Sequence, residues 1–405
     1  MTAQQTRDLP MSGVRVLDLA TFIAAPFCAS ILGEFGAEVI KIEQPDTGDP
    51  WRRYGTPSAR PDSSLAWLTE ARNKKSLTLN LRSPEGADIL RRLVAESDVV
   101  CENFRPGTLE RWGLGYDALA EINPALVMLR VSGYGQTGPY RDRPGFARIA
   151  HAFGGLTHLA GMPGGPPVTP GSTSLGDYMT GLYGAIGVLM ALRQRDRDGK
   201  GQYVDIALYE PVFRVLDELA PAFAAAGTVR GREGIGTANA CPHGHFECGD
   251  GRWVAIACTS DKMFARLAQA MERPELATED AFGRVQSRLA RRDEVDRLVG
   301  DWTRSMPRSA VIDRCLAAEV PIGPINDIEE IFADPQYAAR DNLLKLVEET
   351  VGEVVIPGVV PKLSRTPGRV RTLGPALGSA TDDVLGELLG YSASEIAALK
   401  QRGVV

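Results

Sequence analysis

The chain has 405 residues and a formal net charge of −6 at pH 7, with 44% hydrophobic and 24% charged residues. These proportions are those of a soluble globular protein. A single hydrophobic core seldom extends beyond about 250–300 residues, so two domains are expected. The acidic balance argues against a nucleic-acid partner and against an anionic membrane surface, because both attract a basic face.

The sequence also indicates where the protein is found. Its first ten residues, MTAQQTRDLP, lack the apolar core of a secretory signal peptide. The longest uncharged apolar run, residues 178–192, is shorter than a bilayer requires and contains three glycines, which favours a buried core helix. Six cysteines follow no disulfide framework, which is typical of a reducing compartment. We expect a cytoplasmic location and no membrane association.

Short apolar strands alternate with helices in the first third of the chain, a pattern typical of parallel βαβ units. In the helix at 83–97, Ser83 can cap the first turn and Pro84 takes the first helical position. The pattern predicts a doubly wound parallel sheet. We expect strands at 13–20, 37–44, 76–81, 98–103 and 126–135, and helices at 26–36 and 83–97.

The helical pattern ends at residues 227–244, a glycine-containing stretch that indicates a linker. The next stretch, residues 243–258, contains two alternating runs joined by Gly-Asp-Gly and predicts a β-hairpin. Helical segments continue to about residue 320, and a Pro/Gly-rich segment then leads to a helical tail.

Several common site motifs are missing. The turn after the first strand, TFIAAPF, has no glycine, so neither a nucleotide cofactor of the dinucleotide kind nor a Walker loop is expected. No Gly-x-Ser-x-Gly elbow is present. Cys241, His243, His245 and Cys248 lie close together, but one strand cannot wrap all four around a metal ion. We expect no metal, and a substrate-facing role for one of these histidines stays open.

Asp177 is the only acidic residue between 175 and 192, and it opens an apolar helix. An aspartate here is commonly an N-cap that accepts backbone N–H bonds. The same position would hold a carboxylate ionised, and Gly176 would let a ligand or another backbone approach closely. Gly181, Gly184 and Gly187 would let the helix pack tightly. An ionised, immobilised carboxylate can act as a covalent nucleophile, so both interpretations stay open.

The sequence resembles the class III CoA-transferases, the CaiB/BaiF family, over essentially its whole length. The resemblance rests on AAPFCASILGEFGAEVIKIEQPDTGDPWR, ARNKKSLTLNLRSPEG, DVVCENFRPGTLERWGLGYDAL, INPALVMLRVSGYGQTGPYRDRPGF and LGDYMTGLYGAIGVLMAL. Each motif is loose, but their order and intervals together are specific.

This resemblance implies an α/β fold with a Rossmann-like large domain, whose sheet takes strands from both chain ends, and a smaller α+β domain. The large domain would comprise residues 1–227 and 326–405, and the small domain residues 228–325. The resemblance also implies an interlocked, ring-like homodimer, with a hetero-oligomer of homologous chains as an alternative.

The family mechanism implies that Asp177 forms a mixed anhydride and then an aspartyl-CoA thioester, with coenzyme A as co-substrate. Several motifs look most like the branch that moves CoA from succinyl-CoA to a dicarboxylate such as malate, citramalate or hydroxymethylglutarate. An α-methylacyl-CoA racemase is an alternative, but Phe146 and Ala147 stand where that branch has His-Asp. A CoA-binding subunit of a hetero-oligomeric transferase is another.

Further site residues follow from the same matching. Six positions are expected to contact CoA or line its site: Ile23, Ala24, Arg82, Asn103, Phe104 and Arg111. A dicarboxylate needs a cation for its distal carboxylate, and Arg148 is the hypothesis for that role. His243 is the histidine that we expect to contact substrate.

Overall fold

The computed structural model describes residues 9–405. Its contacts divide the chain into two compact units, each with a hydrophobic core of its own. The first unit comprises Met1–Leu156, Gly171–Asp217 and Gln336–Val405, and the second comprises Thr157–Pro170 and Glu218–Pro335. The first unit therefore combines segments from the N-terminal and C-terminal parts of the chain.

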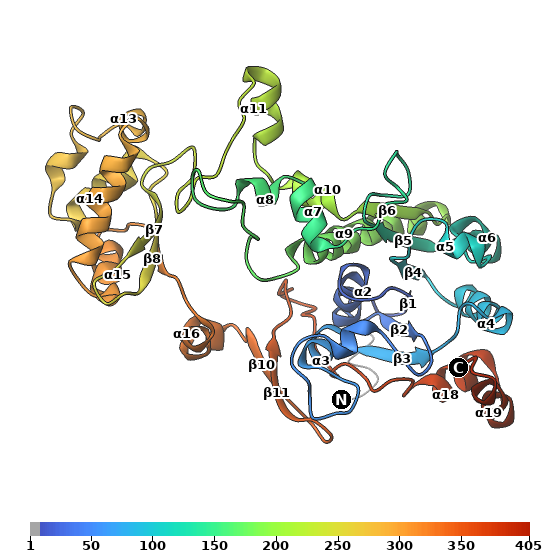
Figure 1. Ribbon diagram of the computed structural model, residues 1–405. Coiled ribbons are helices and arrows are strands. Elements are labelled where there is room, and N and C mark those ends of the chain that lie inside the picture. The colour runs from blue at the N-terminus through green and yellow to red at the C-terminus, as the bar shows by residue number, and fades with distance from the viewer. Residues whose placement is uncertain (1–8) are drawn as a thin grey trace. The chain divides into compact units, whose positions relative to one another are not determined.

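The first unit is built on a six-stranded parallel sheet (Figure 1). Its strand order is β3-β2-β1-β4-β5-β6, so the direction of winding reverses between β1 and β4. Leu17 in β1 lies in register with Ile40 in β2 and with Val100 in β4. The strands are β1 (Arg15–Asp18), β2 (Glu38–Glu43), β3 (Lys74–Thr78), β4 (Val99–Glu102), β5 (Val127–Ser132) and β6 (Tyr203–Ala207). The predicted α/β fold with a parallel sheet is confirmed.

Helices cover both faces of this sheet, because successive side chains of each strand point to opposite faces. Val16 and Val127 belong to a core that includes residues of α2 (Ala24–Glu34) and α9 (Leu175–Asp198). Leu17 and Met128 belong to a second core with α4 (Pro84–Ala95), α6 (Tyr116–Ile122) and α19 (Ala393–Gln401). Burial on both faces explains why the strands are continuous apolar runs in the sequence.

The start of α4 follows the predicted capping chemistry. The Ser83 hydroxyl accepts a hydrogen bond from the Gly86 N–H at 3.0 Å, and Pro84 is the first helical residue. Glu85 lies in the first turn, where the helix dipole favours a negative charge.

Glycines let α9 approach its neighbours closely. A Cβ at Gly181 would lie 2.7 Å from the Ala24 carbonyl oxygen of α2, and one at Gly184 would lie 2.9 Å from Leu129 of β5. Within residues 9–405, α9 alone has the length and hydropathy to cross a membrane. Here its small-residue face contributes Ala185 and Val188 to the core between α2 and the sheet. The predicted tight packing of this helix is confirmed.

The C-terminal segment completes the first unit, but not through its main sheet. All six strands of that sheet come from residues 15–207, so the expected strands from both chain ends are wrong. β10 (Leu343–Glu348) and β11 (Gly352–Pro357) pair only with each other, in an antiparallel hairpin. After it come a Pro/Gly-rich stretch, α18 (Thr381–Asp383), the π-helical turn η3 (Val384–Leu388) and α19. The predicted helical tail is confirmed.

The second unit is α+β. Its sheet joins β7 (His243–Glu247), β8 (Trp253–Ala257) and β9 (Ile322–Pro324) in antiparallel pairs, which confirms the predicted hairpin. Phe246, Val254 and Ile256 pack there against α12 (Asp261–Ala270), α14 (Arg292–Arg304) and α15 (Arg308–Ala317).

Short helices make most of the remaining connections. In the first two thirds of the chain they are η1 (Pro50–Arg53), α3 (Leu65–Glu70), α5 (Thr108–Arg111), α7 (Ala147–Phe153), α8 (Leu156–Leu159), α10 (Tyr209–Arg214) and α11 (Leu219–Ala226). Later ones are η2 (Pro274–Ala277), α13 (Val285–Ala290), α16 (Ile328–Ala333) and α17 (Pro335–Ala339).

The contact between α2 and α9 predicts the effect of one added methyl group. In Gly181→Ala the new Cβ would meet the Ala24 carbonyl and the Phe27 side chain at 2.7–3.0 Å. We expect a loss of about 1–3 kcal/mol of unfolding free energy, because overpacking against backbone outweighs the gain in helix propensity. Gly231→Ala is the control, since nothing lies within 4 Å of its Cβ. Urea unfolding of both variants would test this, and equal stability would contradict the packing argument.

Candidate active site

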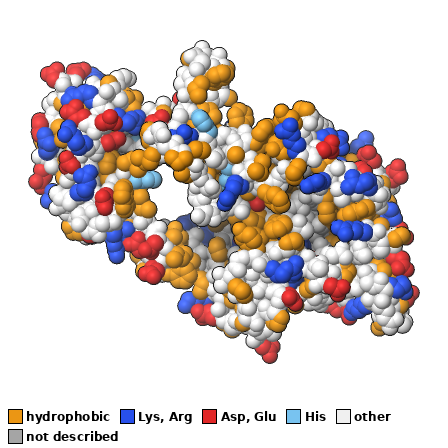
Figure 2. Space-filling model, in the orientation of Figure 1, with side chains coloured by type: hydrophobic (Ala, Val, Ile, Leu, Met, Phe, Trp, Pro, Cys, Tyr) orange, Lys and Arg blue, Asp and Glu red, His pale blue; other side chains and the backbone are white. Residues whose placement is uncertain are grey.

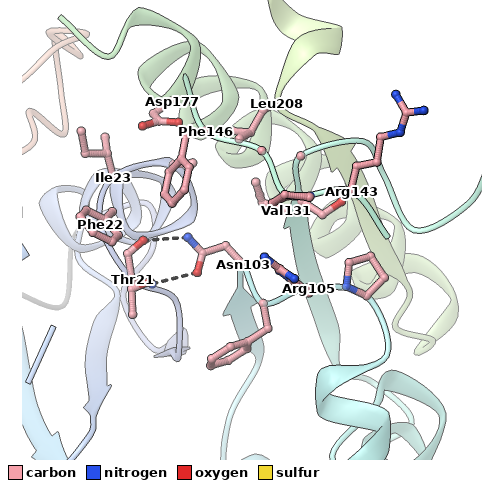
Figure 3. Close-up of a pocket in the computed structure, with 17 residues that line it drawn as sticks. Thr21, Phe22, Ile23, Asn103, Arg105, Val131, Arg143, Phe146, Asp177 and Leu208 are labelled. Atoms are coloured by element: carbon pink, nitrogen blue, oxygen red, sulfur yellow. Dashed lines mark hydrogen bonds between the residues drawn. The ribbon is translucent and has the colours of Figure 1, made fainter. Parts of the chain in front are cut away.

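A pocket of about 220 Å³ lies at the carboxyl ends of the central strands of the first unit (Figure 3). Ligands of open parallel sheets bind at this edge, where the strand order reverses. The pocket lies at the reversal between β1 and β4. Its lining comes from the end of β5, from the segments that follow β1, β4, β5 and β6, and from the start of α9. Examples are Ser132, Thr21, Asn103, Leu208 and Asp177.

Asn103 joins the segments after β1 and β4. Its side-chain Oδ1 accepts from the Thr21 N–H at 2.9 Å, and its Nδ2 donates to the Thr21 carbonyl at 2.7 Å (Figure 3). Both ends of the amide are therefore used to hold the backbone of the β1–α2 loop.

Buried charged side chains hold the rest of this loop. Lys41 donates to the Ala20 carbonyl and forms an ion pair of 3.0 Å with Asp49. Lys74 donates to the Pro26 carbonyl at 2.7 Å and to Asp18 at 2.8 Å. Burial opposes the charge of Lys41, but the carboxylates of Asp18 and Asp49 outweigh it and raise its pKa.

Phe22 adopts a backbone conformation that a phenylalanine rarely takes, with φ at 63°. The Asp49 carboxylate accepts from the Phe22 N–H at 3.1 Å and from the Trp51 N–H at 2.9 Å. Asp49 therefore connects Phe22, through its N–H group, to the buried ion pair with Lys41. The Phe22 ring packs edge-on against Phe146 at the pocket.

This bonding leaves a few backbone donors free. Neither Ile23 N–H nor Ala24 N–H has an acceptor within residues 9–405, and no side chain caps α2 there. Both residues line the pocket. The N-terminus of α2 thus offers N–H groups and the positive end of a helix dipole to a ligand in the pocket.

Among residues 9–405, Asp177 is the only acidic residue that lines the pocket. It is the third residue of α9, whose N-cap is Ser174, so the interpretation of Asp177 as the N-cap is wrong. Its carboxylate has no hydrogen bond or ion pair within the described part of the chain. Burial raises its pKa from 3.8 to about 7. Burial therefore opposes the ionisation that the helix start was expected to favour.

The residues on either side of Asp177 are fixed. Gly176 N–H donates to Nε2 of the buried His151 at 2.7 Å, and a Cβ at Gly176 would meet that ring at 3.1 Å. The Tyr178 hydroxyl donates to Glu70 at 3.1 Å, and its ring packs edge-on against Phe27. The neighbour that Gly176 admits is thus a side chain of the protein itself.

The structure brings together four of the residues expected to contact CoA. Ile23, Ala24, Asn103 and Phe104 all line the pocket with Asp177. Arg82 lies instead in an adjoining pocket of about 280 Å³, which shares Thr21 and Phe104 with the first and also contains Lys41 and Trp112.

Three other predicted residues lie elsewhere. Arg111 is exposed on α5 and donates to Thr108 at 3.1 Å, and it lines neither pocket. Arg148 is exposed on α7 and is not a lining residue. His243 belongs to β7 of the second unit, and the lining residues all belong to the first. The roles proposed for these three residues stay predictions.

Phe22, Arg105, Arg143 and Phe146 also line the pocket, although the sequence had not predicted them there. Arg105 directly follows Asn103 and Phe104, so its position after β4 was the signal that could have identified it. Arg143 stacks on Tyr140 at 3.6 Å and points away from Asp177 (Figure 3).

No group of three or more His, Cys, Asp or Glu side chains placed to hold a metal ion occurs within residues 9–405. In β7, His243 and His245 alternate with the buried Phe246, and Cys248 is buried in the core of the second unit. Burial, aided by Asp296, raises the pKa of the Cys241 thiol to about 12, so this thiol is a poor metal ligand.

The profile of CoA-transferase family III matches residues 11–381. The chain is 59% identical to the succinyl-CoA–L-malate CoA-transferase beta subunit of Chloroflexus aurantiacus, over 99% of each chain. It is 57% identical to an alpha subunit from the same organism, over 98% of this chain and 93% of that one. A CAIB/BAIF family protein of Brucella suis has 33% identity and a TM-score of 0.83, covering 94% of this chain and 99% of that one. The chain belongs to CoA-transferase family III.

Proposed function

We propose that this enzyme moves CoA from succinyl-CoA to L-malate or a similar dicarboxylate, with Asp177 as the covalent nucleophile. The observation that carries the proposal is the site itself. One desolvated carboxylate, Asp177, shares a pocket with the free N–H groups at the start of α2. The names and the 57–59% identity of the Chloroflexus subunits support these substrates.

In the first half of the proposed reaction, an Asp177 oxygen attacks the thioester carbonyl carbon of succinyl-CoA. The C–S bond breaks, CoA leaves as a thiolate, and a mixed anhydride of Asp177 and succinate remains. The thiolate then attacks the carbonyl carbon of Asp177, which releases succinate and leaves an aspartyl-CoA thioester. Each bond that breaks is replaced by another activated acyl bond, so the sequence needs no ATP.

The second half reverses these steps with the acceptor. A malate carboxylate attacks the aspartyl thioester, forms a new anhydride and expels the CoA thiolate. The thiolate attacks the malyl carbonyl carbon, which yields malyl-CoA and regenerates the Asp177 carboxylate. Every step passes through a tetrahedral oxyanion, and the N–H groups of Ile23 and Ala24 are the proposed donors to it.

The environment of Asp177 suits a nucleophile. A carboxylate in water is a weak nucleophile, partly because its hydration shell must be removed before it reacts. Burial removes part of that shell in advance, and it is the same burial that raises the Asp177 pKa to about 7. The carboxylate thus remains reactive and is still substantially ionised at neutral pH.

We propose that the nucleotide part of CoA occupies the adjoining pocket, near Arg82 and the Phe104 and Trp112 rings. A guanidinium fork suits phosphate groups, and aromatic faces suit an adenine. Asn103 would act there by holding the β1–α2 loop, because its amide is already paired with Thr21.

A transferase explains the site better than a racemase does. A racemase needs an acid and a base on opposite sides of the α-carbon. Phe146 and Ala147 occupy the positions of the His-Asp pair of that branch. Nε2 of the nearby His151 already accepts the Gly176 N–H, so it is not free to accept a substrate proton.

We also propose that the protein self-associates through α9 and works in the cytoplasm, where its six buried cysteines stay free thiols. One face of α9 exposes an apolar stripe at helical spacing, and Figure 2 shows further hydrophobic side chains on the surface of the first unit. The near-equal identity to alpha and beta subunits suits a chain that pairs with itself or with a homologous chain. The stripe consists of Leu182, Tyr183, Ile186, Leu189 and Met190, each 36–68% exposed.

Removing the nucleophile should abolish transfer. We expect Asp177→Asn to lower malyl-CoA formation on the order of 10⁴-fold or more, because no covalent intermediate can form. Asp196→Asn, an exposed acid near the other end of α9, is the matched control and should keep full activity. Mass spectrometry of CoA esters gives the rates. Retained activity in Asp177→Asn, or no adduct on Asp177 after succinyl-CoA and hydroxylamine, would refute the mechanism.

The raised pKa predicts how the first step depends on pH. Since only ionised Asp177 attacks, single-turnover formation of the enzyme adduct should rise with pH and reach half its maximum near pH 7. A rate that stays constant from pH 5 to pH 9 would contradict this.

The same shift affects stability. The folded-state pKa lies above the unfolded value of 3.8, so ionisation of Asp177 lowers stability as pH rises from about 4 to 7. Asp177→Asn removes this cost. It should therefore gain about 1–2 kcal/mol over the parent at pH 8 and nothing at pH 4, after allowance for solvent in the pocket.

The apolar stripe predicts the effect of charge on assembly. Ile186→Lys together with Met190→Lys should shift the protein to monomer, because two buried lysines would lie in an apolar interface. Arg197→Glu, near the end of α9, is the control and should leave the mass unchanged. Light scattering after size exclusion measures the mass. A parent protein that is already monomeric at all concentrations would overturn self-association.

A further inference from the structure

A buried histidine of α7 rests against the first turn of α9. The His151 side chain is only 2% exposed, and its Nε2 lies 2.7 Å from the Gly176 nitrogen. Its ring also packs closely on Gly176: a Cβ added there would lie 3.1 Å from the Cδ2 atom and 3.2 Å from the Nε2 atom of His151. Gly176 directly precedes Asp177, so the histidine contacts the residue next to the only acidic residue of the pocket.

The hydrogen bond fixes the protonation state of this histidine. Gly176 N–H is the donor, so Nε2 must be unprotonated and Nδ1 must carry the hydrogen. Nδ1 is buried and has no partner within residues 9–405. Burial, reinforced by the positive charge of Arg148, lowers the His151 pKa below its usual 6.5. The neutral form is therefore the one that the fold favours.

The contact supplies a cap that α9 otherwise lacks. The N-cap residue of α9, Ser174, makes no side-chain capping bond, although its carbonyl accepts from the Asp177 and Tyr178 N–H groups. A free N–H in the first turn is usually bonded by a serine, threonine or aspartate at the N-cap. Here His151, from another helix, accepts from Gly176 instead.

We propose that His151 is a positioning residue for the reaction: as a neutral acceptor it fixes the first turn of α9 and so the place of the Asp177 carboxylate. This inference rests on the proposed role of Asp177. His151 does not touch the reacting atoms. It acts through one peptide group, whose displacement would move the nucleophile relative to the N–H groups of Ile23 and Ala24.

Protonation would convert this cap into a repulsive contact. A protonated His151 carries hydrogens on both ring nitrogens, so Nε2–H would face Gly176 N–H at the positive end of α9. The charged groups of α7, of α10 and of the first four turns of α9 are Arg148 on α7, Asp177 on α9, and Glu210 and Arg214 on α10. The other charged residues of α9 lie at its far end, from Arg193 onward. Of these, Arg148 contributes to the lowered pKa of His151.

The first test compares three variants by steady-state kinetics with succinyl-CoA and L-malate. His151→Leu removes the acceptor and should lower kcat on the order of 10²-fold with little change in KM, as expected for a misplaced nucleophile. His151→Gln keeps an acceptor and should restore most of kcat. Val212→Ala trims another side chain that packs on Gly176, without removing a hydrogen bond, and should change kcat only slightly. Equal loss in the Leu and Ala variants would assign the effect to packing and overturn the proposal.

The second test does not require the leucine variant to fold. Single-turnover adduct formation is measured after a brief pH jump in the parent and in His151→Gln. In the parent two protonations, of Asp177 and of His151, should suppress the rate, so the logarithm of the rate should approach a slope of 2 against pH at low pH. The Gln variant should show a slope of 1. Equal slopes would overturn the role of His151, whereas a parent that forms no adduct at any pH would overturn the proposed nucleophile instead.

Discussion

The β1–α2 loop is held by charges that have been removed from water, and the pocket depends on this arrangement. Asp18, Lys41, Asp49 and Lys74 are almost completely buried, which is costly for each ion unless it is paired and hydrogen-bonded. Here the pairing is combined with bonds to the backbone of residues 20–26. Apolar side chains could fill the same volume, but they could not fix individual peptide groups. The buried ions are best understood as the means by which a loop with a strained Phe22 keeps one conformation.

The two sides of the pocket therefore differ in whether their charged groups are paired. On the α2 side, carboxylates and lysines neutralise one another, and the free N–H groups of Ile23 and Ala24 remain available. On the α9 side, Asp177 is partly buried and has no cation or hydrogen-bond donor beside it within residues 9–405. Its pKa therefore rises to about 7. Preorganised N–H donors stabilise a developing oxyanion without having to reorganise during the reaction. A poorly solvated carboxylate opposite them has less hydration to lose when it attacks.

Much of the fold could be predicted from the sequence because its strands are buried on both faces and are bounded by clear helix starts, such as Ser83–Pro84. The Phe22 conformation, the pairing of Asn103 with Thr21 and the pKa of Asp177 could not be predicted, since each depends on residues far apart in sequence. Position alone suggested a dipole-stabilised carboxylate, whereas the balance between dipole and desolvation is decided by tertiary packing. The prediction that C-terminal strands join the main sheet was wrong because β10 and β11 form their backbone hydrogen bonds with each other.

The neighbours of Asp177 show how the position of a carboxylate can be fixed while its oxygens stay free of hydrogen bonds and ion pairs. A direct hydrogen bond or ion pair would fix its oxygens but would also lower its pKa and its nucleophilicity. The chain instead fixes the residues before and after it, Gly176 through His151 and Tyr178 through Glu70. Within residues 9–405 the carboxylate itself has no hydrogen-bond or ion-pair partner, so its oxygens remain free to interact with a ligand. Restraint of the backbone together with freedom of the side-chain oxygens suits the role proposed for Asp177, in which the carboxylate attacks the donor, is then attacked by the CoA thiolate and is regenerated in every turnover.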